Sequence, residues 1–348
     1  MSRQWRVLIS KSHNIYLNLA WEDWLYRNFD FTKASLLLMW RNTPCVVIGR
    51  YQNPWKECNV SMMADAGILL ARRHSGGGTV YHDMGNLNFS FMTERNLYNR
   101  KTNLHFIVKV LQDVYGIRAV VSPRDDIVVN EKLKVSGTAA KLGRKAAYHH
   151  CTLLCNVEKE HLRAVLKPNN KGIQTTASES VPSPTVNLAE IAPALTCEAL
   201  MNSYKKAAYR DLNGSSDEDA LEWTEEVLPT EEAYHGVTAE ASKLETKDFV
   251  FGNTPKFKIA RDFEEPTTSK KLSFEVLIEK GVIVGATVCG TVDSAYLIEA
   301  ATILSTLNGT DFDSAAMWQK LSELKRNVRG SNADFVYHCI FGALSLKE

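Results

Sequence analysis

The sequence predicts an α/β (α+β) protein of two domains, with a mixed β-sheet in the larger one. Apolar segments of strand length occur along the chain together with segments of helical periodicity. The chain has 348 residues, 45% of them hydrophobic, which is enough for two domains with real cores. We place the boundary in the aromatic, Gly- and Pro-containing stretch 249–257. Residues 1–250 would then form the larger domain, and 251–348 a small α/β accessory domain.

The charge balance and the cysteines limit the classes of partner. The 41 Lys and Arg residues against 40 Asp and Glu give a formal net charge of +1. We therefore expect no nucleic acid and no membrane among the partners, and any recognition of an anion must be local. No apolar run approaches the roughly 18 residues of a membrane span. Seven cysteines, an odd number without framework spacing, indicate free thiols in a reducing compartment.

The first part of the chain predicts short strands and helices that lead to a glycine run. Residues 5–10 favour a strand, and Ser12 is a candidate N-cap for an amphipathic helix over 14–28. The apolar runs 36–41 and 45–49 flank a turn, which predicts a hairpin of buried strands. A helix over 62–66 and a strand over 69–71 follow.

Three consecutive glycines mark the centre of the predicted site. Gly76, Gly77 and Gly78 follow Arg73 and a serine, so a backbone without side chains lies beside a fixed positive charge. Such a run can hold an anion against its amides, although a bare triple glycine is also typical of a flexible turn. A strand that includes Tyr81 follows, and the alternation over 87–91 predicts another, half-buried strand.

The middle of the chain predicts a helix followed by a hairpin. Helical periodicity over 103–115 ends at Gly116, and strands over 127–130 and 133–137 are joined by a two-residue turn. If Lys134 lies on the opposite face from Val135, its ammonium can enter a cleft walled by the glycine run, where a point charge can follow a carbonyl and a phosphate oxygen together. A lone strand lysine would otherwise be a solvated surface charge.

The stretch 147–155 contains two histidines and two cysteines, but we predict no metal site there. On a strand, His149 and His150 face opposite sides, whereas Cys151 and Cys155 share one side. No second ligand pair with zinc spacing appears in the sequence. Core packing or support of a neighbouring site is the better interpretation of these residues.

The remainder of the chain predicts one long loop and the accessory domain. Residues 169–188 are polar and contain two prolines, which predicts a long loop that serves as a lid. The elements expected after it are a helix over 195–210, an exposed loop over 213–219, strands over 272–278 and 282–288, and helices over 299–307 and 314–324.

Three motifs together resemble the lipoate–protein ligase and lipoyltransferase family. The run 72–86 is similar to R-R-x-S-G-G-G-x-V-[FY]-H-D-x-G-N, residues 134–139 to K-x-S-G-x-A, and residues 149–154 to H-H-G-T-L-L. The resemblance is strong over roughly 15–188 and weak beyond. It implies the catalytic-domain fold that this family shares with the biotin protein ligases. The chain departs from the family where Asp125 replaces an Asn and where Cys151 replaces a Gly.

The resemblance also implies roles for individual residues. Lys134 would be the catalytic residue, donating to the acyl carbonyl oxygen and to the departing phosphate. The predicted substrate-binding residues are Arg73, Gly76, Gly77, Gly78, Tyr81, Arg124, Asp126, Gly137, Thr138 and Thr152. Tyr81 and apolar neighbours would surround the acyl chain. Cys151 could be argued as an acyl-accepting thiol, although nothing in the sequence indicates a depressed thiol pKa.

The function that the resemblance implies is transfer of the lipoyl group from lipoyl-AMP to a specific lysine of lipoyl-domain acceptors. Such acceptors are the H protein and the 2-oxoacid dehydrogenase acyltransferase subunits. We expect no tightly bound cofactor and no metal. A full ATP-dependent lipoate–protein ligase needing Mg²⁺ is a second hypothesis, and a non-catalytic acyl-nucleotide-binding scaffold is a third. Bacterial ligases tend to place an arginine where this chain has 183–185 as Ser-Pro-Thr, which favours the transferase.

The cellular location is implied only by the resemblance. The eukaryotic lipoyltransferases point to the mitochondrial matrix, but the N-terminal residues MSRQWRVLIS show no visible transit segment. The acceptor preference, the choice between lipoyl and octanoyl donors and the oligomeric state stay open at this point.

Overall fold

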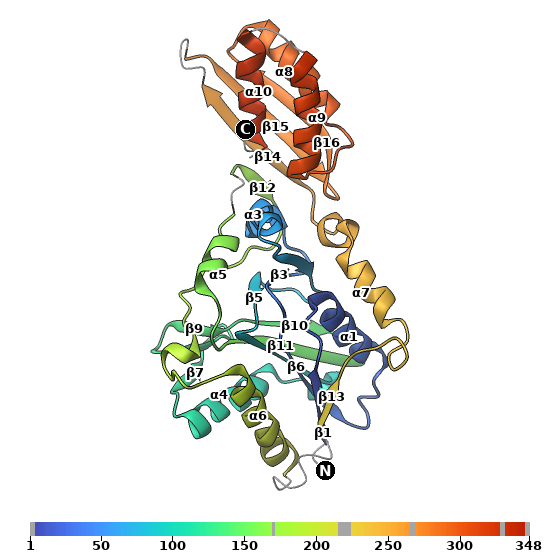
Figure 1. The fold of residues 1–348 in the computed structure, drawn as a ribbon, viewed down its shortest axis with the longest axis vertical. Helices are drawn as coiled ribbons and strands as arrows, with labels where there is room; N and C mark the ends of the chain where they lie inside the picture. The colour runs from blue at the N-terminus through green and yellow to red at the C-terminus, as the bar shows by residue number, and fades with distance from the viewer. Residues whose placement is uncertain (1–3, 169–170, 215–223, 265–268, 328–330, 345–348) are drawn as a thin grey trace. The chain divides into compact units, whose positions relative to one another are not determined.

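The computed structural model describes residues 4–168, 171–214, 224–264, 269–327 and 331–344 (Figure 1). The chain divides into two compact units. One combines Met1–Arg50, Gly67–Leu166 and Ser180–Thr246, and the other combines Tyr51–Ala66, Lys167–Glu179 and Lys247–Glu348. The last change of unit lies close to the predicted boundary at 250, but the second unit also takes two shorter stretches from within 1–250. The functional division into two domains stays a prediction.

The first unit contains a six-stranded mixed sheet. Its strands are β1 (Trp5–Ser10), β2 (Ser35–Trp40), β6 (Asn86–Glu94), β10 (Thr138–Leu142), β11 (Ala146–Leu154) and β13 (Thr224–Val227). They follow the order β10-β11-β6-β2-β1-β13. Strand β1 runs parallel to β2 and β13, whereas the other neighbours are antiparallel. The mixed sheet expected from the sequence is therefore confirmed.

Helices cover both faces of this sheet (Figure 1). Helices α4 (Arg100–Tyr115) and α6 (Cys197–Ala207) pack on one face, where Phe91 meets Phe106 and Phe89 meets Tyr204. Helix α1 (Ile15–Asn28) lies on the other face and is reached by Ser90. Strand β6 is thus buried on both sides, and the half-buried strand expected over 87–91 is wrong because polar side chains here meet a covering helix instead of water.

Two small sheets complete the framework of this unit. Strands β3 (Cys45–Ile48), β4 (Leu69–Arg72) and β5 (Val80–His82) pair in the order β4-β3-β5. Strands β7 (Ala119–Val121), β8 (Ile127–Val129) and β9 (Leu133–Ser136) pair in chain order, which confirms the predicted hairpin of β8 and β9. The predicted hairpin of β2 and β3 is wrong, because the chain crosses from one sheet to another between them.

Short helices connect these strands. They are α2 (Pro54–Glu57), α3 (Val60–Asp65), α5 (Lys159–Val165), α7 (Val237–Glu245), 3₁₀ turns at Arg95–Leu97 and Leu188–Glu190, and π-helical turns at Ala208–Asn213 and Asp248–Gly252. No helix in the described part of the chain is long and apolar enough to cross a bilayer.

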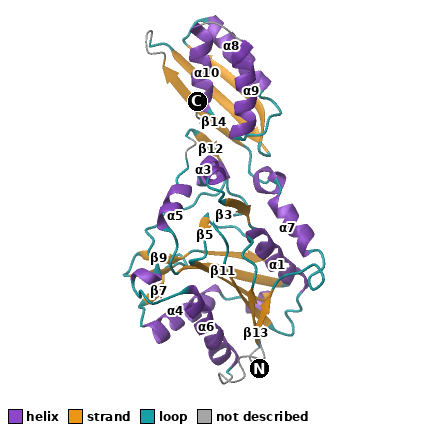
Figure 2. Cartoon of the chain, viewed as in Figure 1, coloured by secondary structure: helices purple, strands orange, loops and turns teal. Residues whose placement is uncertain are grey.

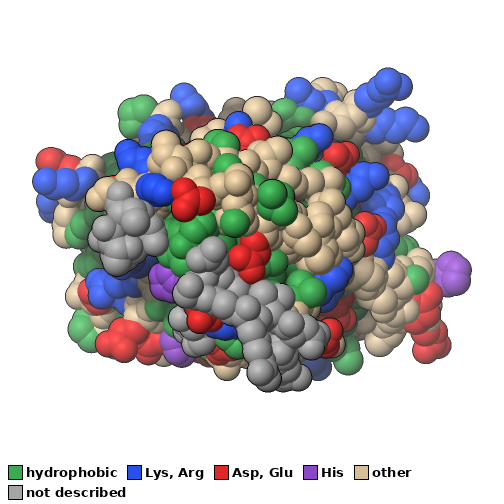
Figure 3. Space-filling view, turned by 90° about the horizontal axis from the view of Figure 1, so that it is seen from above, with side chains coloured by type: hydrophobic (Ala, Val, Ile, Leu, Met, Phe, Trp, Pro, Cys, Tyr) green, Lys and Arg blue, Asp and Glu red, His purple; other side chains and the backbone are tan. Residues whose placement is uncertain are grey.

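The second unit is a four-stranded antiparallel sheet with helices (Figure 2). Besides α2, α3 and the π-helical turn Asp248–Gly252 given above, its elements are β12 (Ile173–Thr175), β14 (Phe257–Glu264), β15 (Lys271–Glu279), β16 (Val282–Gly290), α8 (Ser294–Thr306), α9 (Ser314–Asn327) and α10 (Ser331–Ala343). Alternate residues of β15, such as Phe274 and Val276, are buried together with Leu304 of α8 and Ile340 of α10. On the face drawn in Figure 3, acidic and basic side chains are interspersed.

The structure corrects some local predictions. Asn14 caps α1 in place of Ser12, because its side chain accepts the N–H groups of residues 16 and 17. Gly116 ends α4 in the left-handed conformation with φ 64°, as predicted. The expected loop 169–188 includes strand β12, with residues 169–170 outside the described part. Most of the loop expected over 213–219 also lies outside the described residues.

Candidate active site

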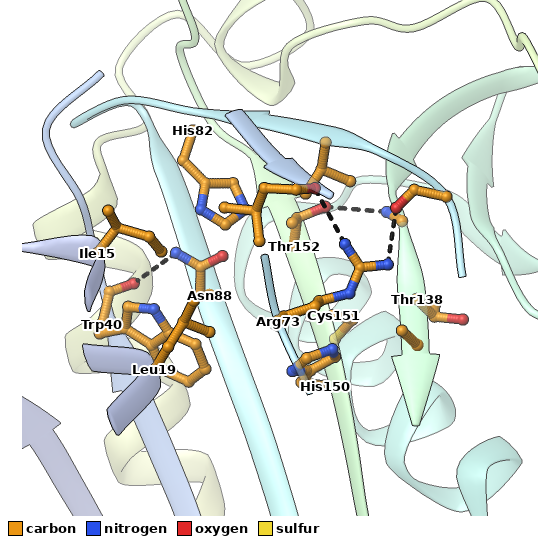
Figure 4. Close-up of a pocket in the computed structure, with 15 residues that line it drawn as sticks. Ile15, Leu19, Trp40, Arg73, His82, Asn88, Thr138, His150, Cys151 and Thr152 are labelled. Atoms are coloured by element: carbon orange, nitrogen blue, oxygen red, sulfur yellow. Dashed lines mark hydrogen bonds between the residues drawn. The ribbon is translucent and has the colours of Figure 1, made fainter. Parts of the chain in front are cut away.

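A pocket lies between one face of the six-stranded sheet and the segments that cover it (Figure 4). It holds about 440 Å³ of empty space, part of it open to solvent. Figure 4 shows Ile15, Leu19 and Trp40 on one side of the pocket and Arg73 and Thr138 on the other. The pocket therefore joins an apolar part, suited to an aliphatic chain, to a part lined by polar groups and bare backbone. Five predicted site residues line it, namely Arg73, Gly78, Gly137, Thr138 and Thr152.

Arg73 holds the glycine run in place instead of reaching into open space. Its Nη2 donates to the carbonyl oxygens of Gly76 at 2.6 Å and Gly78 at 2.7 Å. Its Nη1 donates to Val47 O at 3.0 Å, and its Nε donates to Ser75 Oγ at 3.0 Å. Burial lowers the pKa of Arg73 to about 10, so the side chain still carries its charge at neutral pH. The sequence predicted a ligand contact here, whereas the contacts present are to backbone carbonyls and to Ser75 Oγ.

The contacts of Arg73 fix the direction of the loop amides. In a planar trans peptide the C=O and N–H groups point opposite ways. With the carbonyls of Gly76 and Gly78 turned towards the guanidinium, the N–H groups of Gly77 and Thr79 point away from it. The Thr79 N–H meets Ser180 Oγ at 2.8 Å, so a residue of the predicted lid loop lies against the glycine run. The oriented Gly77 amide can receive an anion, whereas the Thr79 amide is bonded to Ser180 Oγ in this structure.

Gly77 is required by its conformation and by its neighbours. Its φ is 85°, and a Cβ at this position would lie 3.1 Å from Arg73 Nη2 and 3.2 Å from Ala139 Cβ. At Gly76 the φ is ordinary, and a Cβ would meet no atom within 4 Å. The two adjacent glycines therefore differ in what they tolerate.

We expect Gly77→Ala to lower the free energy of unfolding by about 1–2 kcal/mol, because alanine pays the strain of a left-handed conformation. Gly76→Ala is the matched control and should leave stability unchanged or raise it by up to about 1 kcal/mol. Urea unfolding of the two variants checks this. Equal stabilities of the two variants would show that the loop relaxes to accept a side chain and that the positive φ of Gly77 does not require glycine.

Lys134 lies on β9 with its side chain turned out of the core. Val135 beside it is fully buried, as the predicted alternation requires. Lys134 Nζ pairs with Asp126 Oδ1 at 2.7 Å, and both side chains are only partly exposed, at 24% and 14%. A Cβ on Gly137 would lie 3.9 Å from Lys134 Cε, and Gly137 lines the pocket together with Gly78. The lysine stem therefore passes next to the pocket that the glycine run borders.

The backbone of Lys134 is held by the loop that follows β12. Its N–H donates to Pro184 O at 2.8 Å, and its carbonyl accepts the Val186 N–H at 3.1 Å. Lys134 and Thr185 form a parallel bridge. The Ser-Pro-Thr segment at 183–185 replaces the arginine typical of bacterial ligases. It contributes backbone contacts to the predicted catalytic lysine.

The hairpin and strand β11 meet at Thr152. Its Oγ1 accepts the Gly137 N–H at 2.9 Å, and its own N–H donates to Gly137 O at 3.0 Å. These bonds place Gly137 and Thr138 at the pocket. The hydroxyl that the sequence assigned to a ligand is engaged with the backbone in this structure.

Six predicted site residues do not line this pocket. Gly76 and Gly77 belong to the glycine run beside it, and Lys134 and Asp126 form the ion pair described above. The other two are Tyr81 and Arg124. Tyr81 is buried but does not line the pocket, whereas its neighbours Val80 and His82 do. Successive residues of a strand point to opposite faces, and the pocket takes the face of Val80. Arg124 is exposed in the turn before β8. The placement of Tyr81 therefore does not support its expected packing around the acyl chain.

The two departures from the family motifs have structural explanations. Asp125 has φ 63°, and Asn and Asp are the residues other than Gly that tolerate this conformation best. Its carboxylate also accepts from Arg100 Nη1 at 3.1 Å. Cys151 is 4% exposed, and burial raises the pKa of its thiol, which argues against an acyl-accepting role.

Sequence reasoning missed a buried polar network beneath the pocket. His150 Nδ1 lies 3.0 Å from Glu22 Oε1, and His150 Nε2 lies 2.8 Å from Ser75 Oγ. A second chain joins Asn18, Asn42 and His82, with Asn42 Nδ2 3.0 Å from His82 Nδ1. Polar residues at strictly buried positions of a helix were the available signal, but their partners lie far away in sequence.

The two adjacent histidines do face opposite sides of β11, as predicted. His150 lines the pocket, whereas His149 stacks on Phe91 in the core with ring centroids 6.1 Å apart. Burial lowers the pKa of His149 to about 3, and burial with the nearby Arg73 charge lowers that of His82 to about 3. Both rings are therefore neutral at physiological pH.

Among the described residues, one group has potential metal-ligand spacing, and it is already charge-balanced. Asp23, His74 and Glu240 bring their ligand atoms within 4.8 Å of one another. Asp23 also pairs with Arg27 and, at 2.6 Å, with Lys141. The two cations leave the group without the uncompensated negative charge that would favour a metal ion.

Comparison with known proteins agrees with the motifs. Residues 14–208 match the family model described as the lipoyl protein ligase A/B catalytic domain. The chain is 42% identical over 277 residues to the lipoyl amidotransferase LIPT1, mitochondrial, of Homo sapiens, which covers 78% of this chain and 72% of that protein. It is 34% identical over 281 residues to the lipoate-protein ligase A of Bdellovibrio bacteriovorus, covering 80% of each.

A solved structure extends the similarity over almost the whole chain. The crystal structure of P. falciparum LipL1 in complex with lipoate aligns with a TM-score of 0.60 at 27% identity. The alignment covers 98% of this chain and 99% of that one. The similarity therefore includes residues beyond the matched catalytic domain.

Proposed function

The chain belongs to the lipoyl protein ligase A/B catalytic-domain family, and from this membership we propose that it transfers a lipoyl group from lipoyl-AMP to a lysine of a lipoyl-domain protein. The enzyme is an acyltransferase of the lipoyl amidotransferase kind. The observation that carries the proposed donor is the placement of Lys134 beside a pocket that is apolar on one side and bordered by the glycine loop on the other.

The two parts of the donor match the two sides of the pocket. The aliphatic chain and dithiolane ring of the lipoyl group suit the side formed by Ile15, Leu19 and Trp40. The mixed anhydride and its phosphate suit the side of Gly78 and Thr138, where Gly137 also lines the pocket and the Lys134 stem passes next to it. We assign the scissile bond to the junction between these two parts.

The chemistry needs orientation and charge stabilisation, because lipoyl-AMP is already activated. The acceptor amine attacks the acyl carbonyl carbon and forms the amide C–N bond, while the bond from that carbon to the phosphate oxygen breaks. AMP leaves with the bonding electron pair, and the nitrogen loses a proton to solvent water. A lysine amine has a pKa of about 10.4, so on the order of one part in a thousand is neutral near pH 7.4. A nearby positive charge favours that neutral form.

Lys134 supplies this positive charge where oxyanion character develops. Its ammonium can donate to the carbonyl oxygen and to the departing phosphate, while Asp126 holds it by their 2.7 Å ion pair. The bridge to Thr185 fixes the backbone on which it stands. No nucleophilic side chain is required, and the buried Cys151 thiol is unsuited to be one.

We also propose the class of acceptor and the location. The acceptors would be the H protein and the acyltransferase subunits of 2-oxoacid dehydrogenases, and the location would be the mitochondrial matrix. Support for the location comes from the human and mouse relatives, whose names describe them as mitochondrial. ATP and Mg²⁺ would be needed only if the chain also activated free lipoate.

Mass spectrometry of an H protein acceptor tests the proposed donor. We expect acceptor mass to increase by one lipoyl group with lipoyl-AMP, and to do so at least tenfold more slowly with free lipoate, ATP and Mg²⁺. Equal rates with both donors would establish a full ligase. Binding of lipoyl-AMP without modification of any acceptor would instead establish a non-catalytic scaffold and overturn the proposal.

A further inference from the structure

The polar network beneath the pocket connects helix α1 to the glycine loop. It begins at Ser90 Oγ, which donates to Glu22 Oε1 at 2.7 Å, and passes through His150 to Ser75. It ends at Arg73, whose Nε donates to Ser75 Oγ at 3.0 Å. Figure 4 shows His150 and Arg73 at the same end of the pocket.

Each member of this network is strongly buried. The exposed fraction is 2% for Glu22, 0% for Ser90, 1% for Ser75 and 5% for Arg73, and His150 is 9% exposed. Unmatched donors or acceptors are costly at such positions. The protons must therefore be arranged so that each bond has one donor and one acceptor.

The two ends of the network determine that arrangement. A guanidinium can only donate and a carboxylate can only accept. Arg73 therefore donates to Ser75 Oγ. A hydroxyl oxygen can accept two hydrogen bonds, so the Glu22 end decides the rest: with a single ring proton placed opposite the carboxylate, His150 Nε2 accepts the Ser75 hydroxyl proton. His150 Nδ1 then carries the ring proton and donates to Glu22, which also accepts from Ser90.

We propose that Glu22 and His150 are positioning residues for the donor substrate: the carboxylate fixes His150 as the Nδ1–H tautomer, and this orients Ser75 and, through it, Arg73. Arg73 in turn holds the Gly76 and Gly78 carbonyls, so that the Gly77 and Thr79 amides point away from the guanidinium. Neither Glu22 nor His150 takes part in bond making. The consequence for the donor rests on the proposed function, whereas the tautomer does not.

The charge of Glu22 also acts on Arg73 through space. Glu22 is two hydrogen-bonded residues away from the buried Arg73 cation, and its negative charge favours the charged form of that side chain. Burial lowers the pKa of Arg73, and the carboxylate partly offsets that effect without touching the side chain. Direct contact would withdraw Arg73 donors from the glycine carbonyls.

The test is Glu22→Gln, which keeps the shape of the side chain but can present either an oxygen or an amino group to His150. In ¹⁵N spectra of histidine-labelled protein, we expect the wild type to show His150 as one tautomer with the proton on Nδ1. Glu22→Gln should add the Nε2–H tautomer. It should also raise the KM for lipoyl-AMP by about fivefold or more, with the KM for the acceptor and the unfolding temperature little changed.

Asp23→Asn is the matched control. Asp23 is the adjacent buried carboxylate on α1, and it pairs with Lys141 outside this network. It should change neither the His150 spectrum nor the KM for lipoyl-AMP. Ser75→Ala adds a second measurement, since Glu22→Gln should raise the KM no further in that background if Glu22 acts through Ser75.

Three results would overturn the inference. They are an unchanged tautomer in Glu22→Gln, a wild-type KM for lipoyl-AMP in that variant, and simple additivity with Ser75→Ala. Wild-type protein that transfers no lipoyl group would refute the proposed function instead, and the tautomer measurement would still decide the proton arrangement.

Discussion

Lys134→Ala should keep the fold and reduce lipoyl transfer by about a hundredfold or more. The expected loss corresponds to removing one preorganised donor from a developing oxyanion, about 3 kcal/mol or more in the barrier. Stability should change by at most about 1 kcal/mol, since the ion pair with Asp126 is partly exposed at both ends. Single-turnover transfer from lipoyl-AMP to an H protein acceptor, followed by mass spectrometry, measures the effect.

Two further variants test whether the position and the shape of the Lys134 cation matter, or only the presence of positive charge on the hairpin. Lys132→Ala removes an exposed lysine from the same hairpin and should leave turnover close to that of the wild type. Lys134→Arg keeps the positive charge but replaces a compact ammonium by a planar fork, so it should recover only part of the rate. Near-normal transfer by Lys134→Ala would remove the assigned catalytic role, and with it the mechanism given above.

Gly85→Ala should lower the free energy of unfolding by about 3 kcal/mol or more. A Cβ on Gly85 would lie 2.0 Å from Asn156 O and 2.8 Å from Val157 N, both of them backbone atoms that cannot rotate away. The Gly85 carbonyl also accepts the N–H groups of Cys155 and Asn156 at 3.0 and 2.9 Å. Separating the two segments to admit the methyl group would break these bonds.

Thermal and urea unfolding measure this effect. A loss of 3 kcal/mol corresponds to a decrease of about 6–12 °C in Tm for a unit of this size. Gly76→Ala, where a Cβ has open space, is the control for the substitution itself. A Tm within a degree or two of the wild type would mean that the turn before β6 moves freely and does not lock the end of β11.

Most of the regular elements of the first unit follow from local sequence. Strand β1 and helix α1 lie where their patterns predict, within a residue, because apolar spacing and capping groups act over a few neighbouring residues. Pairing was less predictable. Strands β2 and β3 are adjacent in sequence and separated by a turn, yet they enter different sheets. Nothing in a short stretch specifies which distant strand will be its neighbour.

The second unit shows the same limit. The sequence predicted the strands β15 and β16. It did not predict β14, which belongs to the same sheet, or α10, whose residues are buried in the same core. It also placed β12 in a loop, although that strand pairs with β14, where Ile173 lies opposite Ile259, 86 residues further along the chain. Three residues carry too little pattern to predict a strand whose stability comes from its partner.

By itself the sequence determined the chemistry on offer: a backbone run without side chains, a lysine on a short hairpin, and motifs specific enough to identify the family. Tertiary structure decided what each group touches. It turned Tyr81 away from the pocket and Val80 into it, and committed Arg73 to the glycine carbonyls. It also brought Glu22 to His150 across 128 positions of sequence. The reason is physical, because the register of a sheet and the packing of a helix across it set the direction of a side chain, and both depend on contacts between residues far apart in the chain.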